Sequence, residues 1–188
     1  MALGDLCPAC GGARRSAVVQ AGAALASAGA LNAHVSVGYN PARPWQQKWR
    51  DVENGLHMLE DLYSRDGASN EDVRREVEEF FKSCRELADW LSEHAGKRDA
   101  MTYVNSDPDL VLCNGMTQTI KHHTRRPGRD PDPITARVSW VHGGGVRAEI
   151  EWSRPSGPRG TEDALDLARR CAAAWTRFFQ QHRLDPSG

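Results

Sequence analysis

VRREVEEFFKSCRELADWL, residues 73–91, carries the strongest helical pattern in the chain. Its apolar residues recur at steps of three and four, which places them on one face of an α-helix. We expect Asn70 to cap this helix, with Glu71 and Asp72 near its positive end. The predicted buried face consists of Val73, Val77, Phe80, Phe81, Cys84, Leu87 and Leu91, with Trp90 widening it.

A second amphipathic helix is predicted upstream, beginning at Pro44 and ending before the turn 65–67. Proline suits the first turn of a helix, because its missing N–H would have no partner there. The apolar residues follow alternating steps of four and three, as one buried helical face requires. They are Trp45, Trp49, Val52, Leu56, Leu59 and Tyr63.

Two further helices are predicted downstream. The third has Asp107 as its cap and Pro108 in its first turn, and it ends in the turn-forming segment 125–133. The last begins after a cap at Thr161, and the segment 153–160 before it is expected to be a loop. The buried stripe of the last helix is Leu165, Ala168, Ala172, Trp175 and Phe179, joined by Leu184.

Residues 134–152 change period, because apolar and polar residues alternate there on both sides of the glycines at 143–145. Such alternation predicts an antiparallel hairpin with one apolar face. A lone hairpin is only marginally stable in water, so this face must pack on helices. The sequence therefore predicts a mainly α fold: a bundle of about four helices, with a two-stranded antiparallel β-hairpin between the third and last helices.

Residues 1–43 differ from the helical part, since they are rich in Ala and Gly and contain a Cys7-x-x-Cys10 motif. We expect a loosely ordered N-terminal arm at 1–43 and a helical bundle domain at 44–188, with its hairpin at 134–152. The paired arginines and Ala-rich run at 14–33 resemble a crude export signal, so export stays open beside a cytoplasmic location.

Composition excludes some classes of function. Lys plus Arg is 24 and Asp plus Glu is 25, so the chain has no globally basic footprint for nucleic acid, and RNA contact would need a local patch. Five cysteines at scattered positions do not form the framework of a secreted disulfide-rich protein. No stretch is apolar for long enough to span a bilayer, so no membrane partner is expected.

A polar stripe is predicted on the third helix, because residues four and seven apart share a face. It consists of Asn114, Gln118, Lys121 and Arg125, with His122 beside it. One interpretation is a surface that binds nucleic acid or phosphate, with an imidazole for proton transfer. The other is a solvated face whose cations favour the negative end of the helix dipole.

Arg177 and His182 form a second candidate pair near the end of the last helix. An arginine can stabilise a phosphate while a histidine transfers a proton, which suits RNA cleavage without a metal ion. The competing interpretation is an ordinary cationic helix end.

Cys7 and Cys10 supply two thiolates, which is half of a tetrahedral zinc site. His34 is a candidate third ligand, and a fourth is not evident in the sequence. Zinc at this motif is the only cofactor that the sequence suggests. Asp89, near the buried face of the helix at 73–91, is expected to pair with Lys121 or with an arginine across a helix interface.

Three segments together resemble a group of small, largely uncharacterised bacterial and phage proteins: FFKSCRELADWL (80–91), LCNGMTQTIKHH (112–123) and DALDLARRCAAAWTRFF (163–179). The resemblance covers roughly residues 45–184 and omits the arm. That group is similar in outline to the HEPN superfamily of helical bundles, many of which are dimeric ribonucleases of defence or toxin systems. Their signature is an arginine, a short polar spacer and a histidine on a late helix.

Arg177 and His182 match the HEPN spacing, whereas Phe178 stands where these ribonucleases favour a polar residue. The resemblance implies an RNA-handling protein, in its catalytic form a metal-independent endoribonuclease. Arg177 would bind the scissile phosphate and His182 would transfer the proton. The alternative is a non-enzymatic interaction or oligomerisation module, whose partner surface is the outer face of the hairpin or a two-fold contact, with a zinc-clipped arm.

Overall fold

A computed structural model describes residues 45–121, 134–141 and 147–187. The arm at 1–43, with Cys7 and Cys10, lies outside the described residues, as do His122, Arg125 and the hairpin tip. The described elements, in chain order, are α2 (Trp45–Ser64), α3 (Asn70–His94), α4 (Ala100–Ser106), α5 (Pro108–Lys121), β1 (Thr135–Val141), β2 (Arg147–Ser153), β3 (Arg159–Asp163) and α6 (Ala164–His182).

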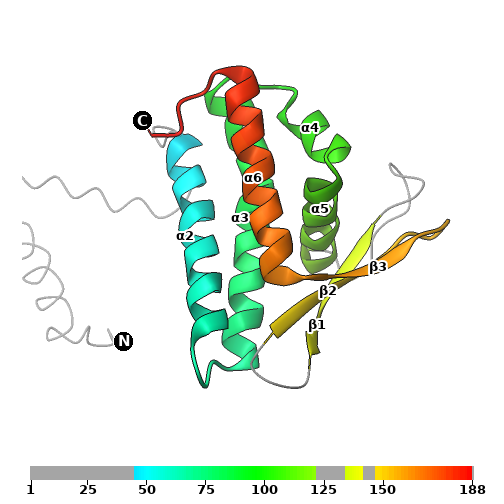
Figure 1. Cartoon of the computed structure of the whole chain (residues 1–188). Coiled ribbons are helices and arrows are strands. Elements are labelled where there is room, and N and C mark those ends of the chain that lie inside the picture. Colours follow the sequence, from blue (N-terminus) through cyan, green and yellow to red (C-terminus); the bar gives the residue numbers. More distant parts are fainter. Residues whose placement is uncertain (1–44, 122–133, 142–146, 188) are drawn as a thin grey trace, which may run out of the picture. The chain divides into compact units, whose positions relative to one another are not determined.

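The described chain is mainly helical with a small antiparallel sheet, as the sequence predicts (Figure 1). It differs in two elements. The short helix α4 lies between α3 and α5, and its seven residues are too few to show a helical period in the sequence. The sheet has three strands in the order β1-β2-β3 instead of two. The finer prediction, about four helices with a two-stranded hairpin, therefore does not match the structure exactly.

The third strand occupies part of the segment that we expected to be a loop. β3 pairs antiparallel to β2, with Gly160 opposite Trp152. A Cβ on Gly160 would lie 2.9 Å from atoms of the Trp152 ring, so the glycine makes room for the indole. Because β3 has no apolar alternation, pattern alone did not reveal it; its backbone hydrogen bonds to β2 define it.

Two predicted helix caps were wrong by one or two residues. Ser69 caps α3, because its hydroxyl accepts a hydrogen bond from the Asp72 N–H at 3.1 Å. Asp163 caps α6 by accepting from the Asp166 N–H at 3.0 Å, while Thr161 belongs to β3. In both cases a second residue suited to capping stands within two positions, and the local backbone decides between them.

The helix α3 lies at the centre of the bundle and contacts α2, α4, α5 and α6. Its predicted face is buried, and Phe81, Cys84 and Leu87 are fully inaccessible. Trp175 of α6 lies in the same core, as does Trp49 of α2. The helices therefore share one apolar interior, as expected for amphipathic helices that hide their stripes from water.

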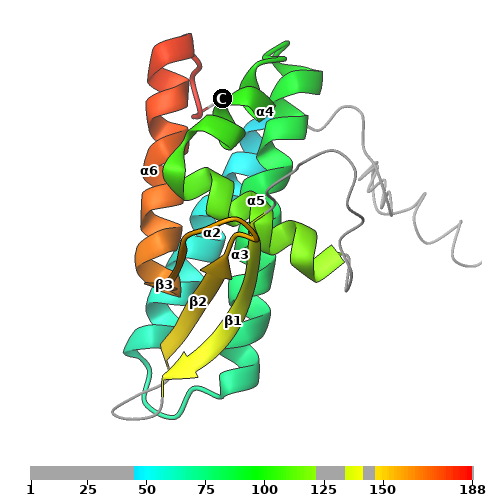
Figure 2. The same ribbon diagram turned by 90° about the vertical axis from the view of Figure 1, so that its right-hand side faces the viewer.

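The sheet packs against this bundle through its inner face, which includes Ala136, Ala148 and Ile150. Figures 1 and 2 show the sheet and α4 at opposite ends of α5. At the end of α2, the Tyr63 hydroxyl donates to the Ala148 carbonyl at 3.0 Å and accepts from the Ala148 N–H at 3.1 Å. Burial raises the pKa of Tyr63 to about 12, so this bridge keeps its proton well above neutral pH.

Among the described residues, none of the helices combines the length and the apolar character that crossing a lipid bilayer requires.

Gly115 fixes how closely the sheet approaches α5, because a Cβ there would lie 2.7 Å from Cγ2 of Ile134. We expect Gly115→Ala to lower the free energy of unfolding by about 1–3 kcal/mol through this overlap. Gly55→Ala is the matched control: its Cβ would meet Phe80 at 3.4 Å, an ordinary contact in a helix interior. The control should stabilise by roughly 0.5–1 kcal/mol, since alanine is the better helix former.

Urea unfolding followed by circular dichroism measures both variants. Equal stability of the two variants would show that the contact between α5 and β1 does not constrain the fold.

Candidate functional site

Arg177 and His182 both reach the residues that flank α4. The Arg177 guanidinium lies 3.1 Å from the Asp107 carboxylate, which follows α4. The His182 Nε2 lies 3.2 Å from the Asp99 carboxylate, which precedes α4. One short helix thus presents an aspartate at each end to the two residues that the sequence singled out as a pair.

Asp107 performs two tasks with its two oxygens. Its Oδ1 accepts hydrogen bonds from the backbone N–H groups of Asp109 and Leu110, at 3.0 and 3.1 Å, and so caps α5 as predicted. Its Oδ2 accepts from Arg177 at 3.1 Å. The carboxylate is only 8% exposed, so these partners replace the water that it loses.

Arg177 remains open to solvent although it is paired, since 51% of its side chain is exposed. Burial opposes its charge, but hydrogen bonds to Asp107 and Tyr103 outweigh that effect and raise the pKa of the guanidinium above its usual value. Only one of its terminal nitrogens contacts Asp107, and a guanidinium has five N–H donors. The unused donors are available to an anion from outside.

His182 is more enclosed than Arg177, with 26% of its side chain exposed. Its ring lies 4.1 Å from the ring of Phe178, centroid to centroid. Arg183 ends the helix in the left-handed conformation, at φ 52°. Lys97 and Arg98 precede Asp99 in the chain, and Arg98 and Arg183 are exposed, so cationic residues border the Asp99–His182 pair on both segments.

The predicted polar stripe on α5 is partly covered by neighbouring elements, although Lys121 is exposed. Asn114 donates from its amide to Asn105 of α4, at 3.3 Å. Gln118 is half-buried. Lys121 lies 4.0 Å from Glu86 of α3. His122 and Arg125 lie outside the described residues, so the continuous stripe stays a prediction.

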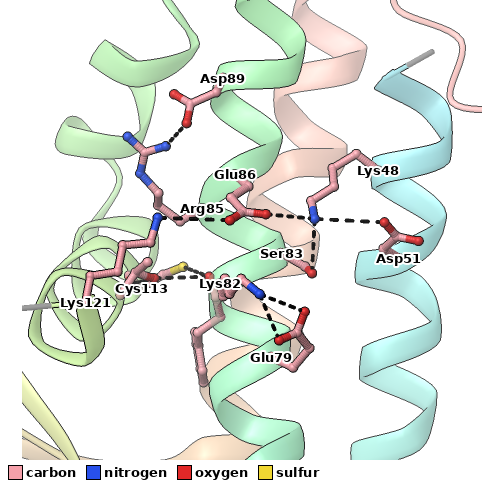
Figure 3. A network of polar contacts seen from close by, with 12 residues as sticks. Lys48, Asp51, Glu79, Lys82, Ser83, Arg85, Glu86, Asp89, Cys113 and Lys121 are labelled. Carbon is pink, nitrogen blue, oxygen red and sulfur yellow. Dashed lines mark hydrogen bonds and ion pairs between the residues drawn. The ribbon is translucent and has the colours of Figure 1, made fainter. Parts of the chain in front are cut away.

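Lys121 joins a network of charges that links three helices (Figure 3). Glu86 pairs with Lys48 of α2 at 2.9 Å, and Lys48 donates to the Ser83 hydroxyl at 3.3 Å. The Lys48 side chain is only 11% exposed, so Glu86 and Ser83 replace the water that its ammonium group loses. Lys121, with 43% of its side chain exposed, lies at the edge of this network, where an ion pair contributes little to stability.

Asp89 pairs with Arg85, one turn earlier in the same helix, and not across a helix interface as the sequence suggested (Figure 3). The prediction failed because the Asp89 carboxylate is 60% exposed and needs no partner from another helix. Residues four apart on a helix are close enough to form this contact.

The spacing of residues along the chain does not indicate the cluster formed by Cys84, Cys113 and Cys171. Their sulfur atoms lie within 4.8 Å of one another, and all three residues are buried. Burial suits reduced cysteines, which act as small hydrophobes in a helical core. Their convergence depends on how α3, α5 and α6 pack, which the spacing within one helix cannot reveal.

Comparison of the chain with protein-family models, with curated proteins and with solved structures found no match.

Because Asp107 both caps α5 and pairs with Arg177, we expect three variants to lose unfolding free energy in a definite order. Asp107→Ala removes both the cap of α5 and the partner of Arg177, and should cost about 2 kcal/mol of unfolding free energy. Arg177→Ala removes only a half-exposed partner and should cost less than about 1 kcal/mol. Asp107→Asn keeps an oxygen for the cap and should fall between the two.

Thermal and urea unfolding of the three variants would test this order. A loss in Arg177→Ala as large as that in Asp107→Ala would show that the ion pair, and not the cap, is the main contribution of Asp107.

Proposed function

We propose that the protein binds RNA and cleaves it without a metal ion, at the surface formed by α4, its two flanking aspartates and the C-terminal half of α6. The observation that carries this proposal is the shared anchoring of Arg177 and His182 by Asp107 and Asp99, with half of the Arg177 side chain exposed. The HEPN-like spacing of the two residues, stated from the sequence, points the same way.

The chemistry assigned to this surface uses groups already on it. Arg177 would hold the non-bridging oxygens of one phosphate through the N–H groups that Asp107 leaves unused. The 2′-hydroxyl of the preceding ribose would attack that phosphate, and the bond to the 5′-oxygen would break. The products are a 2′,3′-cyclic phosphate and a free 5′-hydroxyl.

His182 would transfer a proton in this reaction, either from the attacking hydroxyl or to the leaving oxygen. Since Asp99 contacts Nε2, the transfer would use Nδ1. Asp99 and Asp107 would act as positioning residues, because each holds the side chain that touches the RNA. Lys97, Arg98 and Arg183 would attract the backbone on either side of the cleaved phosphate.

Cleavage of labelled single-stranded RNA by the full-length protein in EDTA tests the proposal. We expect His182→Ala to slow cleavage by about 10²-fold or more, the usual contribution of a positioned proton-transfer group. Arg177→Ala should weaken RNA binding. It should also reduce the slope of log binding constant against log salt concentration by about 1, the contribution of one phosphate contact. Arg169→Ala is the matched control, because Arg169 lies on the same helix but pairs with Glu60 of α2.

Intact RNA after incubation with folded wild-type protein, or an equal cleavage rate in His182→Ala, would exclude catalysis at this surface. Unchanged binding and salt dependence in Arg177→Ala would exclude the phosphate contact as well.

A second candidate function is that of a non-enzymatic interaction module, and the outer face of the sheet supports it. A hollow there is lined by Trp152 and by polar and charged residues, including Arg137, Glu151 and Arg159. Arg137 donates to Glu151 across the strands at 2.6 Å, and this hydrogen bond lowers the pKa of Glu151. A partner protein or a second copy of the chain would dock on this polar face.

Light scattering and zinc analysis of the full-length protein separate the candidates. A stable dimer that leaves RNA intact would favour the module, and zinc bound in proportion to the chain would support a metal-clipped arm. A zinc-free monomer would remove both the clipped arm and the two-fold contact.

A further inference from the structure

The three cysteines of the core come from three different helices. Cys84 lies in the middle of α3, Cys113 in α5 and Cys171 in α6, and their sulfur atoms are all within 4.8 Å of one another. None of the three residues is more than 1% exposed. Packing explains why each is buried, since a reduced cysteine behaves as a small hydrophobe, but it does not require three sulfurs to meet at one point.

The thiols have weak hydrogen bonds and no strong ones. The Cys113 thiol donates to the Phe81 carbonyl at 3.3 Å, and the Cys171 thiol donates to the Asp109 carbonyl at 3.5 Å. Trp175 donates to the backbone carbonyl of Cys84 at 3.1 Å, which fixes α6 against α3 beside the sulfurs. The polypeptide around the cluster is thus held in place by contacts that do not use the sulfur lone pairs.

The protein core disfavours ionised thiols in this cluster. Burial raises the pKa of Cys113 and Cys171 well above the usual range of a thiol. A cation that binds there must therefore displace protons from the sulfurs.

The spacing of the sulfurs suits a single metal ion. An ion held about 2.3 Å from each of three sulfurs, the usual metal–thiolate distance in zinc sites, needs those sulfurs about 4 Å apart. The separations in the structure, up to 4.8 Å, need only a small contraction.

The number and type of ligands select the ion. Thiolates favour soft cations such as Cu(I) and Zn(II). Structural zinc sites almost always have four ligands, whereas the group in the described part of the chain consists of three sulfurs, without histidine or carboxylate. Three-coordinate sulfur is an ordinary geometry for a monovalent d¹⁰ ion. Arg85 follows Cys84 in the chain, and only 15% of its side chain is exposed. Its positive charge lies near Cys113 and favours a negatively charged sulfur there.

We propose that Cys84, Cys113 and Cys171 form a buried three-thiolate site for one Cu(I) ion. Binding replaces the S–H protons of the three cysteines, which pass to water, and it joins α3, α5 and α6 through one centre. Because the sulfurs are closed off from solvent, the ion is taken up as the core forms or when it opens. This site does not depend on RNA binding at α4 and α6.

The experiment uses the full-length chain with Cys7→Ser and Cys10→Ser, which leaves the three core cysteines out of the five in the sequence. The reduced protein is unfolded and then refolded without oxygen, with one equivalent of Cu(I) and a competing coloured chelator. We expect one copper per chain to remain after gel filtration, with three sulfur neighbours and no nitrogen or oxygen in X-ray absorption. The melting temperature should rise, because the ion binds the folded state.

Cys113→Ser in that background is the test variant, because serine keeps a donor for the Phe81 carbonyl but supplies no thiolate. Its copper retention should fall by at least tenfold. Should this variant fail to fold, alkylation in denaturant of the chain that keeps all three thiols provides the second measurement. Bound Cu(I) should slow modification of these thiols severalfold compared with the copper-free protein.

Three results would overturn the proposal: no copper retained by the variant with three cysteines, undiminished retention in Cys113→Ser, or alkylation unaffected by copper. Retention of Zn(II) as strong as that of Cu(I) in the same competition would overturn the choice of ion.

Discussion

The burial of Trp175 is the interaction on which the rest of the structure depends. Its ring is fully inaccessible, and its Nε1 donates to the Cys84 carbonyl in the middle of α3. Tyr103, Phe178 and Phe179 surround it with ring centroids 5.6–6.4 Å away. A buried indole without a partner for its N–H would be costly, so this hydrogen bond fixes both the depth and the rotation of α6.

The rotation of α6 determines what its other side chains can reach. Cys171 lies one turn before Trp175 on the buried face, and it meets the sulfurs of α3 and α5. Arg177 lies two residues after Trp175 and turns toward Asp107, while His182 reaches Asp99 at the other end of α4. One helix thus contributes both to a closed cluster of thiols and to an open, cationic surface.

The helical pattern predicted the main helices because burial of an amphipathic stripe is a local property that the sequence records directly. The faces of α2, α3 and α6 were expected from spacing alone, and Trp49, Phe81 and Trp175 do lie in one core. The caps at Ser69 and Asp163 were missed because neighbouring residues have the same capping chemistry. β3 was missed because an edge strand with Gly160 opposite Trp152 has no apolar alternation to detect.

The candidate site was predicted only in part, for a physical reason. The sequence singled out Arg177 and His182, since their residue types and spacing suit phosphate chemistry. It did not reveal that aspartates on both sides of α4 hold them, because α4 is too short to show a period. The thiol cluster needs three helices to converge, and such contacts arise from tertiary packing, which no spacing within one segment encodes.

Hydrogen exchange of the full-length protein tests most directly whether α3 and α6 form one cooperative core around Trp175. Backbone amides near Cys84 in α3 and near Trp175 in α6 should be the slowest to exchange. Both groups should exchange with the same free energy of opening and respond equally to added urea, because they open only in global unfolding. Faster exchange in α6, by a local opening that leaves α3 protected, would contradict a core that depends on this tryptophan.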